Sequence, residues 1–593
     1  MSYTLQPIWN IAHICHRHGI ENVIISPGSR SAPLTLAFVR HKNLNCKVIA
    51  DERSAAFIAL GIAQQTNKPV VLICTSGSAA YNYAPAIAEA YFQQIPLLVL
   101  TADRPPEWID QFDGQTIRQT NIYGKHVKES YTLPVDLSHE DAVWHIERTI
   151  SEAINLSKTY PFAPVHINAP FREPFYPPVE NQEESSLEES VNNFYENQIK
   201  YDVDVKIIEQ IHSRPKIRTQ HWEELLEVWN GTEKKLIVGG QMRYNERLIS
   251  ALNGLEVTVV ADVISNLHIV KNSIQHQDVF LMNRESLEEL RPELLITFGK
   301  SVISKNLKKF LREYPAIEHW HIQPAGIAAD TFQSLTKVIP LNPSYFFRKV
   351  LEKQTAFAES YRQSFFVDNW RGTDAEIKKL NAQFFEEQPF SEFQAVKILM
   401  EHLPQRSNFH LANSMSVRYA NYLNLDKDAN KEIEIFSNRG TSGIDGSTST
   451  AIGHALADDE TLNILLTGDV AFFYDRNAFW NNYLPKNLIV ILLNNHGGGI
   501  FKMLPDAAKQ PESDEFFVIK QPLNAESLSK EFELEYTFCE DKSKIEFQEA
   551  LEKLELDTEK RSRISIIEVK TSIETNTKVF QDYKKAVKFL EVD

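Results

Sequence analysis

Two short polar motifs in the last third of the sequence each follow a run of apolar residues, and together they could hold a metal ion and a diphosphate. Asp469 follows the apolar run 462–467, and Asn495 comes 26 positions later, after the apolar run 488–493. Mg²⁺ prefers an octahedron of oxygen ligands and usually shares them with phosphates. The carboxylate of Asp469, the amide oxygen of Asn495 and the backbone carbonyl of Gly497 would supply three ligands, and two diphosphate oxygens and a water would complete the shell.

The strands that precede the two motifs must bring them together. Both apolar runs are predicted to form neighbouring parallel strands, with a helical segment at 476–483 between them, and open α/β sheets bind ligands at the carboxyl ends of such strands. The glycines at 497–499 would let the backbone approach a diphosphate closely. Either motif alone is typical of an ordinary turn. Their pairing behind two buried strands is what indicates a metal–diphosphate site.

Similar apolar runs, separated by helical patterns, occur along nearly the whole chain. Continuous apolar strands that alternate with helices predict parallel sheets covered on both faces. We predict strands at 22–26, 47–51, 70–75, 96–102, 235–239, 256–261, 293–298, 318–322, 409–412, 433–436, 462–467, 488–493 and 564–569. The predicted fold class is α/β, with three consecutive doubly wound parallel-sheet domains at 1–178, 206–385 and 386–593 and an acidic linker at 179–205.

The composition limits the classes of protein and partner to consider. The 593 residues are 43% hydrophobic and 24% charged, as in ordinary globular proteins, and the net charge of −17 argues against binding to nucleic acid. No apolar run approaches the roughly 18–20 residues that span a membrane, and the N-terminus has no signal-peptide pattern. The four cysteines form no CxxC pair, which is typical of reduced thiols in a cytoplasmic protein.

Four further stretches, taken with the split motif, carry a resemblance to a known family. They are Ile25-Ser-Pro-Gly-Ser-Arg-Ser31, Thr101-Ala-Asp-Arg-Pro-Pro106, Gln115-Thr-Ile-Arg-Gln119 and Ser437-Asn-Arg-Gly-Thr-Ser-Gly-Ile-Asp-Gly446. In this order they resemble the 2-succinyl-5-enolpyruvyl-6-hydroxy-3-cyclohexene-1-carboxylate synthases (the MenD type) of menaquinone biosynthesis, within the thiamine-diphosphate-dependent superfamily. The superfamily motif is Gly-Asp-Gly followed by Asn-Asn, and Val470 stands here in place of the second glycine.

The resemblance implies a thiamine-diphosphate-binding fold with thiamine diphosphate and Mg²⁺ as cofactors, and Mn²⁺ as an alternative ion. By resemblance, Glu52 is the catalytic glutamate that bonds the aminopyrimidine ring of the cofactor and so promotes removal of its C2 proton. From the residues alone, Glu52 would merely complement a helix dipole, and Asp51 is interpreted as structural. The implied cofactor-binding residues are Glu52, Ser414, Ile444, Gly468, Asp469, Asn495, Gly497 and Ile500, with Asp469, Asn495 and Gly497 as metal ligands.

The resemblance also implies two substrates with two carboxylates each, 2-oxoglutarate and isochorismate. Arginine suits such substrates because its planar guanidinium pairs with a carboxylate through two hydrogen bonds. In an acidic chain these arginines would have to form a local basic pocket. The implied substrate-binding residues are Ser29, Arg30, Arg104, Gln115, Lys305, Arg418, Arg439, Phe501 and Leu504. Asn306 stands where the family can show an arginine after Lys305.

The activity implied by the resemblance is that of a transferase, a carboligase of menaquinone biosynthesis. Such an enzyme decarboxylates 2-oxoglutarate and adds the succinyl semialdehyde carbanion equivalent to isochorismate. The resemblance further implies a homodimer or homotetramer with the active site at the subunit interface. Two alternatives are another thiamine-diphosphate-dependent 2-oxo acid decarboxylase, such as an acetolactate-synthase-like enzyme, and a non-catalytic sensor that binds the cofactor.

Overall fold

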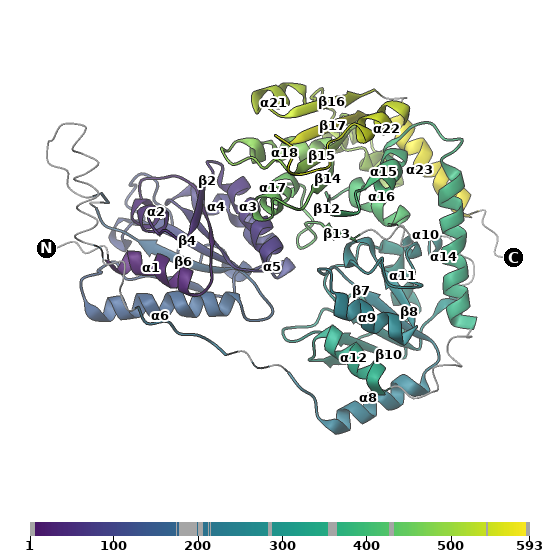
Figure 1. Cartoon of the computed structure of the whole chain (residues 1–593), viewed down its shortest axis with the longest axis horizontal. Coiled ribbons are helices and arrows are strands. Elements are labelled where there is room, and N and C mark those ends of the chain that lie inside the picture. The colour runs from purple at the N-terminus through teal and green to yellow at the C-terminus, as the bar shows by residue number, and fades with distance from the viewer. Residues whose placement is uncertain are drawn as a thin grey trace. The chain divides into compact units, whose positions relative to one another are not determined.

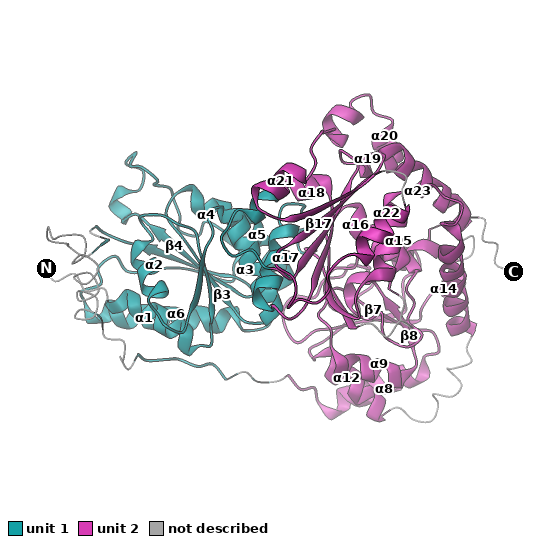
Figure 2. Ribbon diagram, turned by 45° about the horizontal axis from the view of Figure 1, so that its top comes forward, with its two compact units in different colours: residues 1–213, 440–458, 475–485 teal, residues 214–439, 459–474, 486–593 magenta. Residues whose placement is uncertain are grey.

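A computed structural model, drawn in Figure 1, describes most of the chain. The described residues are 6–173, 175–176, 199, 205–211, 213, 215–282, 287–353, 365–425, 432–540 and 544–588. The chain divides into two compact units, coloured separately in Figure 2: unit 1 contains residues 1–213, 440–458 and 475–485, and unit 2 contains residues 214–439, 459–474 and 486–593. No helix in the described part of the chain is long and apolar enough to cross a membrane.

Unit 1 is built on a six-stranded parallel sheet, sheet A, with the strand order β2-β1-β3-β4-β6-β5. Its strands are β1 (Asn22–Ile25), β2 (Asn45–Val48), β3 (Val70–Cys74), β4 (Leu97–Asp103), β5 (Ser130–Thr132) and β6 (Val165–Pro170). Its helices are α1 (Gln6–Arg17), α2 (Ala32–Val39), α3 (Glu52–Thr66), α4 (Ser78–Asn82), α5 (Ala84–Gln93), η1 (Pro106–Trp108), η2 (Gly124–His126), α6 (Glu140–Ser157), α17 (Ser447–Ala457) and η6 (Arg476–Phe479). The chain order reverses between β1 and β3, which is the point where such sheets bind ligands.

Unit 2 contains two parallel sheets, and the first is the five-stranded sheet B, with the order β11-β10-β9-β7-β8. Its strands are β7 (Lys235–Gly239), β8 (Thr258–Ala261), β9 (Leu294–Phe298), β10 (Glu318–Ile322) and β11 (Lys337–Ile339). The helices of this part are α8 (Thr219–Gly231), α9 (Glu246–Leu255), η3 (Val263–Ser265), α10 (Gln277–Phe280), η4 (Glu288–Leu290), α11 (Lys305–Glu313) and α12 (Pro343–Lys353).

The second sheet of unit 2, sheet C, has six parallel strands in the order β13-β12-β14-β15-β17-β16, the same relative order as sheet A. Its strands are β12 (Arg406–Leu411), β13 (Glu432–Phe436), β14 (Asn463–Gly468), β15 (Leu488–Asn494), β16 (Glu535–Cys539) and β17 (Ser565–Lys570). Its helices are α14 (Phe365–Phe384), α15 (Glu392–His402), α16 (Met415–Leu423), α18 (Asp469–Tyr474), α19 (Ile500–Met503), α20 (Pro505–Ala508), the π-helix η7 (Ser513–Val518), α21 (Glu526–Glu531), α22 (Lys544–Glu552) and α23 (Ile573–Lys588).

The predicted fold class is confirmed, because three separate parallel sheets follow one another along the chain. β14 and β15 pair in parallel with Gly468 opposite Leu493, so Asp469 and Asn495 leave the same edge of sheet C, as predicted. The predicted domain limits remain a prediction. The predicted acidic linker lies outside the described residues, apart from positions 199 and 205.

Local differences from the predicted elements have identifiable causes. The predicted strand at 47–51 ends early, at Val48, because Asp51 caps α3. The predicted helical segment at 476–483 is mainly the short η6, since the helix after β14 begins earlier, at Asp469. The strands β5, β6, β11 and β16 were not predicted. Polar residues such as His166 and Asn168 interrupt the apolar pattern of β6.

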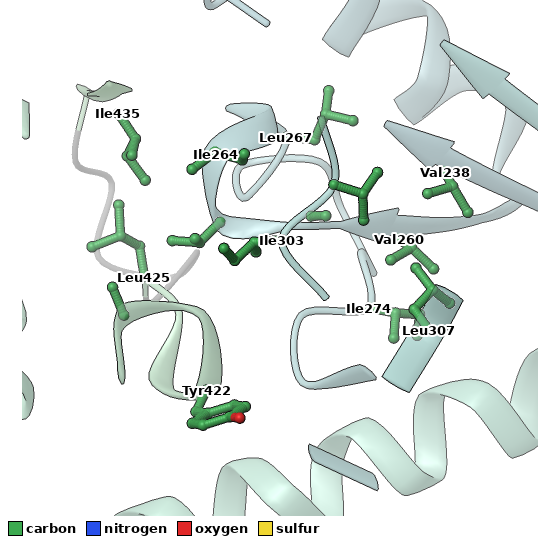
Figure 3. Packing of buried hydrophobic residues seen from close by; sticks show 14 of the residues in the cluster. Val238, Val260, Ile264, Leu267, Ile274, Ile303, Leu307, Tyr422, Leu425 and Ile435 are labelled. Carbon is green, nitrogen blue, oxygen red and sulfur yellow. The ribbon is translucent and has the colours of Figure 1, made fainter. Parts of the chain in front are cut away.

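The core of unit 2 is continuous between its two sheets. A single buried apolar cluster contains residues of sheet B and its helices together with residues of β12, β13 and α16. Figure 3 shows part of this cluster, in which Ile264 and Ile303 lie on the side of sheet B and Leu425 and Ile435 on the side of sheet C. The part of the chain that contains sheet C therefore packs on the central part through a shared core. This core includes residues of β14 and β15, the strands that precede Asp469 and Asn495.

A buried histidine of sheet A should make stability depend on pH. His166 is fully buried, and its ring nitrogens pair with Thr101 Oγ1 and Ser130 Oγ, each at 2.8 Å. Burial lowers the pKa of His166 to about 3, whereas unfolding restores a pKa of about 6.5. The folded state thus binds fewer protons between these values. The stabilisation is complete above pH about 6.5 and is lost as the pH falls towards 3.

We expect His166→Gln to be less stable than the wild type at pH 7, with a difference that shrinks as the pH falls from 6.5 to 4. Glutamine keeps a hydrogen-bonding group but does not titrate in this range, and each unit of pKa difference corresponds to about 1.4 kcal/mol. Thermal unfolding of both proteins across this range measures the difference. His221→Gln, at an exposed position on α8, is the control. A stability difference that does not change with pH would contradict the prediction.

Candidate active site

Asp469 is a buried carboxylate at the carboxyl end of β14 and the first residue of α18. It is 2% exposed. Its Oδ2 accepts a hydrogen bond from Gln521 Nε2 at 2.8 Å, and its Oδ1 accepts one from the backbone N–H of Val470 at 2.9 Å. Burial raises the pKa of Asp469 to about 6, although these hydrogen bonds oppose the rise. A bound cation would favour the charged form that burial disfavours.

Asn495 follows β15 and carries the second predicted ligand atom. Its Nδ2 donates a hydrogen bond to Glu392 Oε1 at 2.5 Å. Its Oδ1 is buried and has no hydrogen-bond partner among the described residues. An acceptor that is left unpaired in the interior is costly, so this oxygen is suited to a ligand that supplies a positive charge.

The glycines after Asn495 are required by close packing of the loop. His496 adopts a left-handed backbone with φ of 61°. A Cβ on Gly497 would lie 2.8 Å from the carbonyl oxygen of Val518, and the N–H of Gly498 donates to that oxygen at 2.6 Å. The carbonyl of Gly497 accepts from the N–H of Gly499 at 2.9 Å, which leaves a second lone pair. The space around these glycines is thus limited by the backbone of Val518 and by the side chains of Phe501 and Asn495, and the approach of this loop to a diphosphate stays a prediction.

The residues at this edge of sheet C fit a hard divalent cation held together with a diphosphate. They offer one carboxylate, one amide oxygen and one backbone carbonyl, all oxygen donors of the kind that Mg²⁺ binds. No group of three or more His, Cys, Asp or Glu side chains in the described part of the chain is arranged to hold a metal ion. A cation here would therefore depend on the amide and carbonyl oxygens and on phosphate oxygens of its ligand.

Val470, the departure from the superfamily motif, is compatible with the observed backbone. The residue lies in the first turn of α18. Its φ is not positive, so its backbone conformation does not favour a glycine. Any L-residue can adopt this helical conformation, so the substitution does not disturb the position of Asp469.

Glu52, the predicted catalytic residue, lies at the N-terminus of α3 in unit 1 and is half-buried. Its Oε2 accepts a hydrogen bond from Asn82 Nδ2 at 3.4 Å. The neighbouring Asp51 has a structural role, as interpreted from the sequence: its side chain caps the N–H of Ser54 at 3.0 Å and accepts from Asn477 Nδ2 at 2.7 Å. The helix start that carries Glu52 is therefore fixed from two sides.

The helix behind Glu52 packs closely on α17, the helix after the loop that carries Ile444. A Cβ on Gly61 of α3 would lie 2.2 Å from the carbonyl oxygen of Thr450, and one on Gly453 of α17 would lie 2.2 Å from that of Ile58. Only glycines allow this approach of the two backbones. The loop before α17 is held in the same unit.

Glu89 anchors the loop that contains Ile444. Its buried carboxylate accepts hydrogen bonds from the backbone N–H groups of Gly440 and Thr441, at 2.7 and 2.6 Å. Ile444 itself is half-buried. Glu89 thus fixes the start of the loop whose isoleucine, by resemblance to the family, would support the cofactor.

Arg30 and Arg104 are brought together at the carboxyl edge of sheet A. Each lies near the same carboxylate oxygen of Glu173, at 3.6 Å for Arg30 and 4.0 Å for Arg104. Arg30 also donates to the carbonyl of Phe171, and Arg104 pairs with Asp113 at 3.1 Å. Two guanidinium groups around one carboxylate are a suitable arrangement for an anionic substrate.

The other predicted polar contacts of unit 1, Ser29 and Gln115, are both exposed. Gln115 has a positive φ of 54° and belongs to a loop that Gln119 holds to the sheet edge. Gln119 is buried, accepts from the N–H of Gly77 at 2.9 Å and donates to the carbonyl of Ala102 at 3.0 Å. Gln115 is therefore placed beside the sheet edge by a buried neighbour.

The predicted residues Ser414, Arg418 and Arg439 of unit 2 lie near the end of β12. Arg439 donates to Asn413 Oδ1 at 2.7 Å, and Arg418 donates to the carbonyl of Ser414. Ser414 has a positive φ of 72°. All three predicted residues, Ser414, Arg418 and Arg439, are half-buried.

Lys305 is exposed at the start of α11, in the part of unit 2 that contains sheet B. The following residue, Asn306, has a structural role. Its side chain donates to the carbonyl of Asp278 at 2.7 Å, and its backbone N–H donates to the Asp278 carboxylate at 2.8 Å. An arginine at this position would keep the backbone bond, and only the short side-chain bond to the Asp278 carbonyl is specific to asparagine.

The predicted apolar wall lies on and beside α19, directly after the glycines. Ile500 and Phe501 are half-buried, and Leu504 is 46% exposed. The ring of Phe501 lies 5.7 Å from that of Phe517 in the π-helix η7. Such helices are frequent at functional sites.

Sequence reasoning missed several polar residues beside the metal-type site. Glu392 and Gln521 contact Asn495 and Asp469, and a cavity of about 520 Å³ next to Asn495 is lined in part by Lys520 and Lys570. Burial raises the pKa of Glu392 to about 7, although the hydrogen bond from Asn495 opposes the rise. Glu392 follows Ser391, an N-cap, so the sequence alone presents it as an ordinary first-turn acid.

The predicted site residues fall into two groups, each described within its own unit. Unit 1 carries Ser29, Arg30, Glu52, Arg104, Gln115 and Ile444. Unit 2 carries Lys305, Ser414, Arg418, Arg439, Gly468, Asp469, Asn495, Gly497, Ile500, Phe501 and Leu504. Each group contains two or more arginines at a carboxyl edge of a sheet.

Two family profiles match the sequence. The one described as "Thiamine pyrophosphate enzyme, N-terminal TPP binding domain" matches residues 10–122, and the one described as "Middle domain of thiamine pyrophosphate" matches residues 197–411. Curated proteins named 2-succinyl-5-enolpyruvyl-6-hydroxy-3-cyclohexene-1-carboxylate synthase are similar to this chain: 45% identical in Cytophaga hutchinsonii, 41% in Flavobacterium johnsoniae and 34% in Bacteroides fragilis. These matches cover 98%, 97% and 98% of this chain and 99%, 98% and 99% of the relatives.

Proposed function

Because the chain belongs to the 2-succinyl-5-enolpyruvyl-6-hydroxy-3-cyclohexene-1-carboxylate synthase family of thiamine-diphosphate enzymes, we propose that it catalyses the reaction of that name in menaquinone biosynthesis. It is a transferase that decarboxylates 2-oxoglutarate and adds the resulting succinyl semialdehyde carbanion equivalent to isochorismate. The observation that carries the proposal is the buried Oδ1 of Asn495, which has no hydrogen-bond partner in the described part of the chain, together with the buried carboxylate of Asp469 at the end of the neighbouring parallel strand.

The cofactors proposed are thiamine diphosphate and Mg²⁺, with Mn²⁺ as an alternative ion. Asp469, Asn495 and the carbonyl of Gly497 would hold the cation, and Gly468, Ser414 and Ile500 would line the cofactor site. Bound thiamine diphosphate supplies the nucleophilic carbon and the electron sink that decarboxylation requires. The protein's own residues would bind and orient the cofactor and the substrates and would exclude water from the site. Glu52 would hold a proton on the aminopyrimidine ring, and Ile444 would support the cofactor from below.

The arginines would bind and orient the substrate carboxylates. Arg30 and Arg104 already converge on one carboxylate, that of Glu173, and Arg418 and Arg439 lie near the end of β12. Ser29 and Gln115 would add neutral hydrogen bonds, and Lys305 a further charge. Phe501 and Leu504 would contact the carbon skeleton. Four arginines exceed the need of a monocarboxylate such as pyruvate, which favours dicarboxylate substrates over the acetolactate-synthase-like alternative.

A homodimer or homotetramer with the active site at the subunit interface is part of the proposal. The candidate residues divide between two compact units, with Glu52 in unit 1 and Asp469 in unit 2, and the family resemblance implies that these are supplied by different subunits. A cytoplasmic location is the corresponding prediction from the cysteine pattern.

The test is an assay of the purified protein with 2-oxoglutarate, isochorismate, thiamine diphosphate and Mg²⁺. We expect release of carbon dioxide and formation of the adduct, detected by mass spectrometry, only when both cofactors and both substrates are present. Preferential turnover of pyruvate would favour the acetolactate-synthase-like alternative. Binding of thiamine diphosphate without turnover of either acid, by folded protein, would favour the sensor and overturn the proposal.

A further inference from the structure

Glu392 is a buried carboxylate to which the proposed chemistry assigns no role. It begins α15 and is 3% exposed. Its Oε1 accepts a hydrogen bond from Asn495 Nδ2 at 2.5 Å and another from Thr571 Oγ1 at 3.4 Å. A buried side chain that bonds a proposed cation ligand is placed to control the orientation of that ligand.

The contact with Glu392 determines which atom of Asn495 is available to a cation. An amide has one oxygen acceptor and one NH₂ donor, and an ionised carboxylate is an acceptor only. When Nδ2 donates to Glu392, Oδ1 must point the other way. This is the oxygen that is buried without a partner among the described residues. If the amide turned over, its NH₂ group would face the cation site and repel the ion.

The backbone of Glu392 already provides the structural attachment of α15. Its N–H donates to Asn576 Oδ1 at 2.9 Å, and Asn576 Nδ2 donates to Thr571 Oγ1 at 3.0 Å. These bonds link α15 to α23, and Figure 1 shows both helices beside sheet C. The side chain is not needed for that link. It instead places an acceptor oxygen next to the amide of Asn495.

We propose that Glu392 is a positioning residue of the cation site, whose carboxylate holds the Asn495 amide so that Oδ1 is presented to the divalent ion. The inference rests on the proposed function, because it concerns the site that would bind Mg²⁺ and the diphosphate. A carboxylate behind a neutral ligand also strengthens that ligand, as partners of this kind do in metal sites, where their loss typically reduces affinity by about 10–100-fold.

An exchange of donor and acceptor tests the contact directly. In Asn495→Asp an oxygen still faces the cation, but the second oxygen faces Glu392. The N–H···O hydrogen bond is lost, and the two carboxylates either repel each other or must bind a proton between them. We expect Mg²⁺ affinity at saturating thiamine diphosphate, measured by calorimetry on the full-length protein, to fall at least tenfold. The double variant Glu392→Gln/Asn495→Asp restores one donor, one acceptor and the original charge. It should return to within about threefold of the wild type.

A second variant leaves Asn495 intact in case Asn495→Asp does not fold. Glu392→Met removes the acceptor at similar volume, and we expect a 10–100-fold loss of Mg²⁺ affinity with the KM for 2-oxoglutarate unchanged. Glu401→Gln, an exposed position of the same helix, is the matched control and should bind Mg²⁺ like the wild type. Melting temperatures of the cofactor-free proteins report folding.

The outcomes separate this inference from the proposed function. If the wild type binds Mg²⁺ and turns over both substrates, but the double variant stays as weak as Asn495→Asp and Glu392→Met binds normally, Glu392 has no positioning role and the inference is overturned alone. Failure of the proposed function would appear in the wild type itself, as absent turnover or absent Mg²⁺-dependent binding of thiamine diphosphate. Absent Mg²⁺ binding would overturn both.

Discussion

Glu52→Gln should abolish turnover while leaving thiamine diphosphate and Mg²⁺ bound. The substitution keeps the size of the side chain and its bond with Asn82, but glutamine cannot take up or hold a proton as a carboxylate does. Loss of a proton-transfer group typically reduces the rate by about 10²–10⁴-fold. The residues proposed to hold the diphosphate and the cation lie in unit 2 and are unchanged. Carbon dioxide release measures turnover, and calorimetry measures cofactor affinity.

Asp51→Asn is the matched control for this experiment. It removes the same charge from the adjacent position, and asparagine caps a helix about as well as aspartate does. The amide oxygen can keep the cap on Ser54, and the new NH₂ group can donate to Asn477 once the Asn477 amide turns over, in place of the bond that Asp51 accepts from it. We expect kcat to stay within a few-fold of the wild type. Equal losses of activity in both variants would indicate a general effect of charge at the start of α3. Wild-type turnover in Glu52→Gln would remove Glu52 from the catalytic role.

The core of the candidate site was predictable because its geometry follows from local rules. A buried strand places the residue after it at the carboxyl edge of a parallel sheet, so two motifs behind neighbouring strands must lie close together. Gly468 pairs with Leu493, so the residues that follow the two strands leave the sheet at the same edge. Asp51, which we interpret from the sequence as structural, caps the helix that begins at Glu52.

The supporting contacts were not predictable because they join residues that are far apart in sequence. Glu392 and Asn495 are 103 positions apart, and Asp469 and Gln521 are 52 apart. Neither pair has a characteristic spacing, since each depends on how helices and loops pack over the sheet. The joint approach of Arg30 and Arg104 to Glu173 depends on packing in the same way. Only the three-dimensional arrangement reveals which polar groups orient the ligands.

Asp469→Ala should eliminate Mg²⁺-dependent binding of thiamine diphosphate. Asp469 is the only charged side chain among the three proposed ligands. We expect the affinity to fall by at least about 100-fold, because loss of a residue that only supports a metal ligand already reduces metal affinity by about 10–100-fold. The change should not unfold the protein. Burial disfavours the ionised carboxylate and raises its pKa to about 6, so removing it relieves a cost in the cofactor-free state, and the cofactor-free variant should melt within a few degrees of the wild type.

Stabilisation by ligands then separates lost binding from lost folding. A ligand at about 100 times its Kd stabilises a protein by about 2.7 kcal/mol, so thiamine diphosphate with Mg²⁺ should raise the melting temperature of the wild type and leave that of Asp469→Ala unchanged. Asp459→Ala makes the same substitution at an exposed position before β14 and should respond like the wild type. If Asp469→Ala were stabilised by the two cofactors as strongly as the wild type, the cation would have to be held elsewhere. The pairing of Asp469 with Asn495 would then be structural.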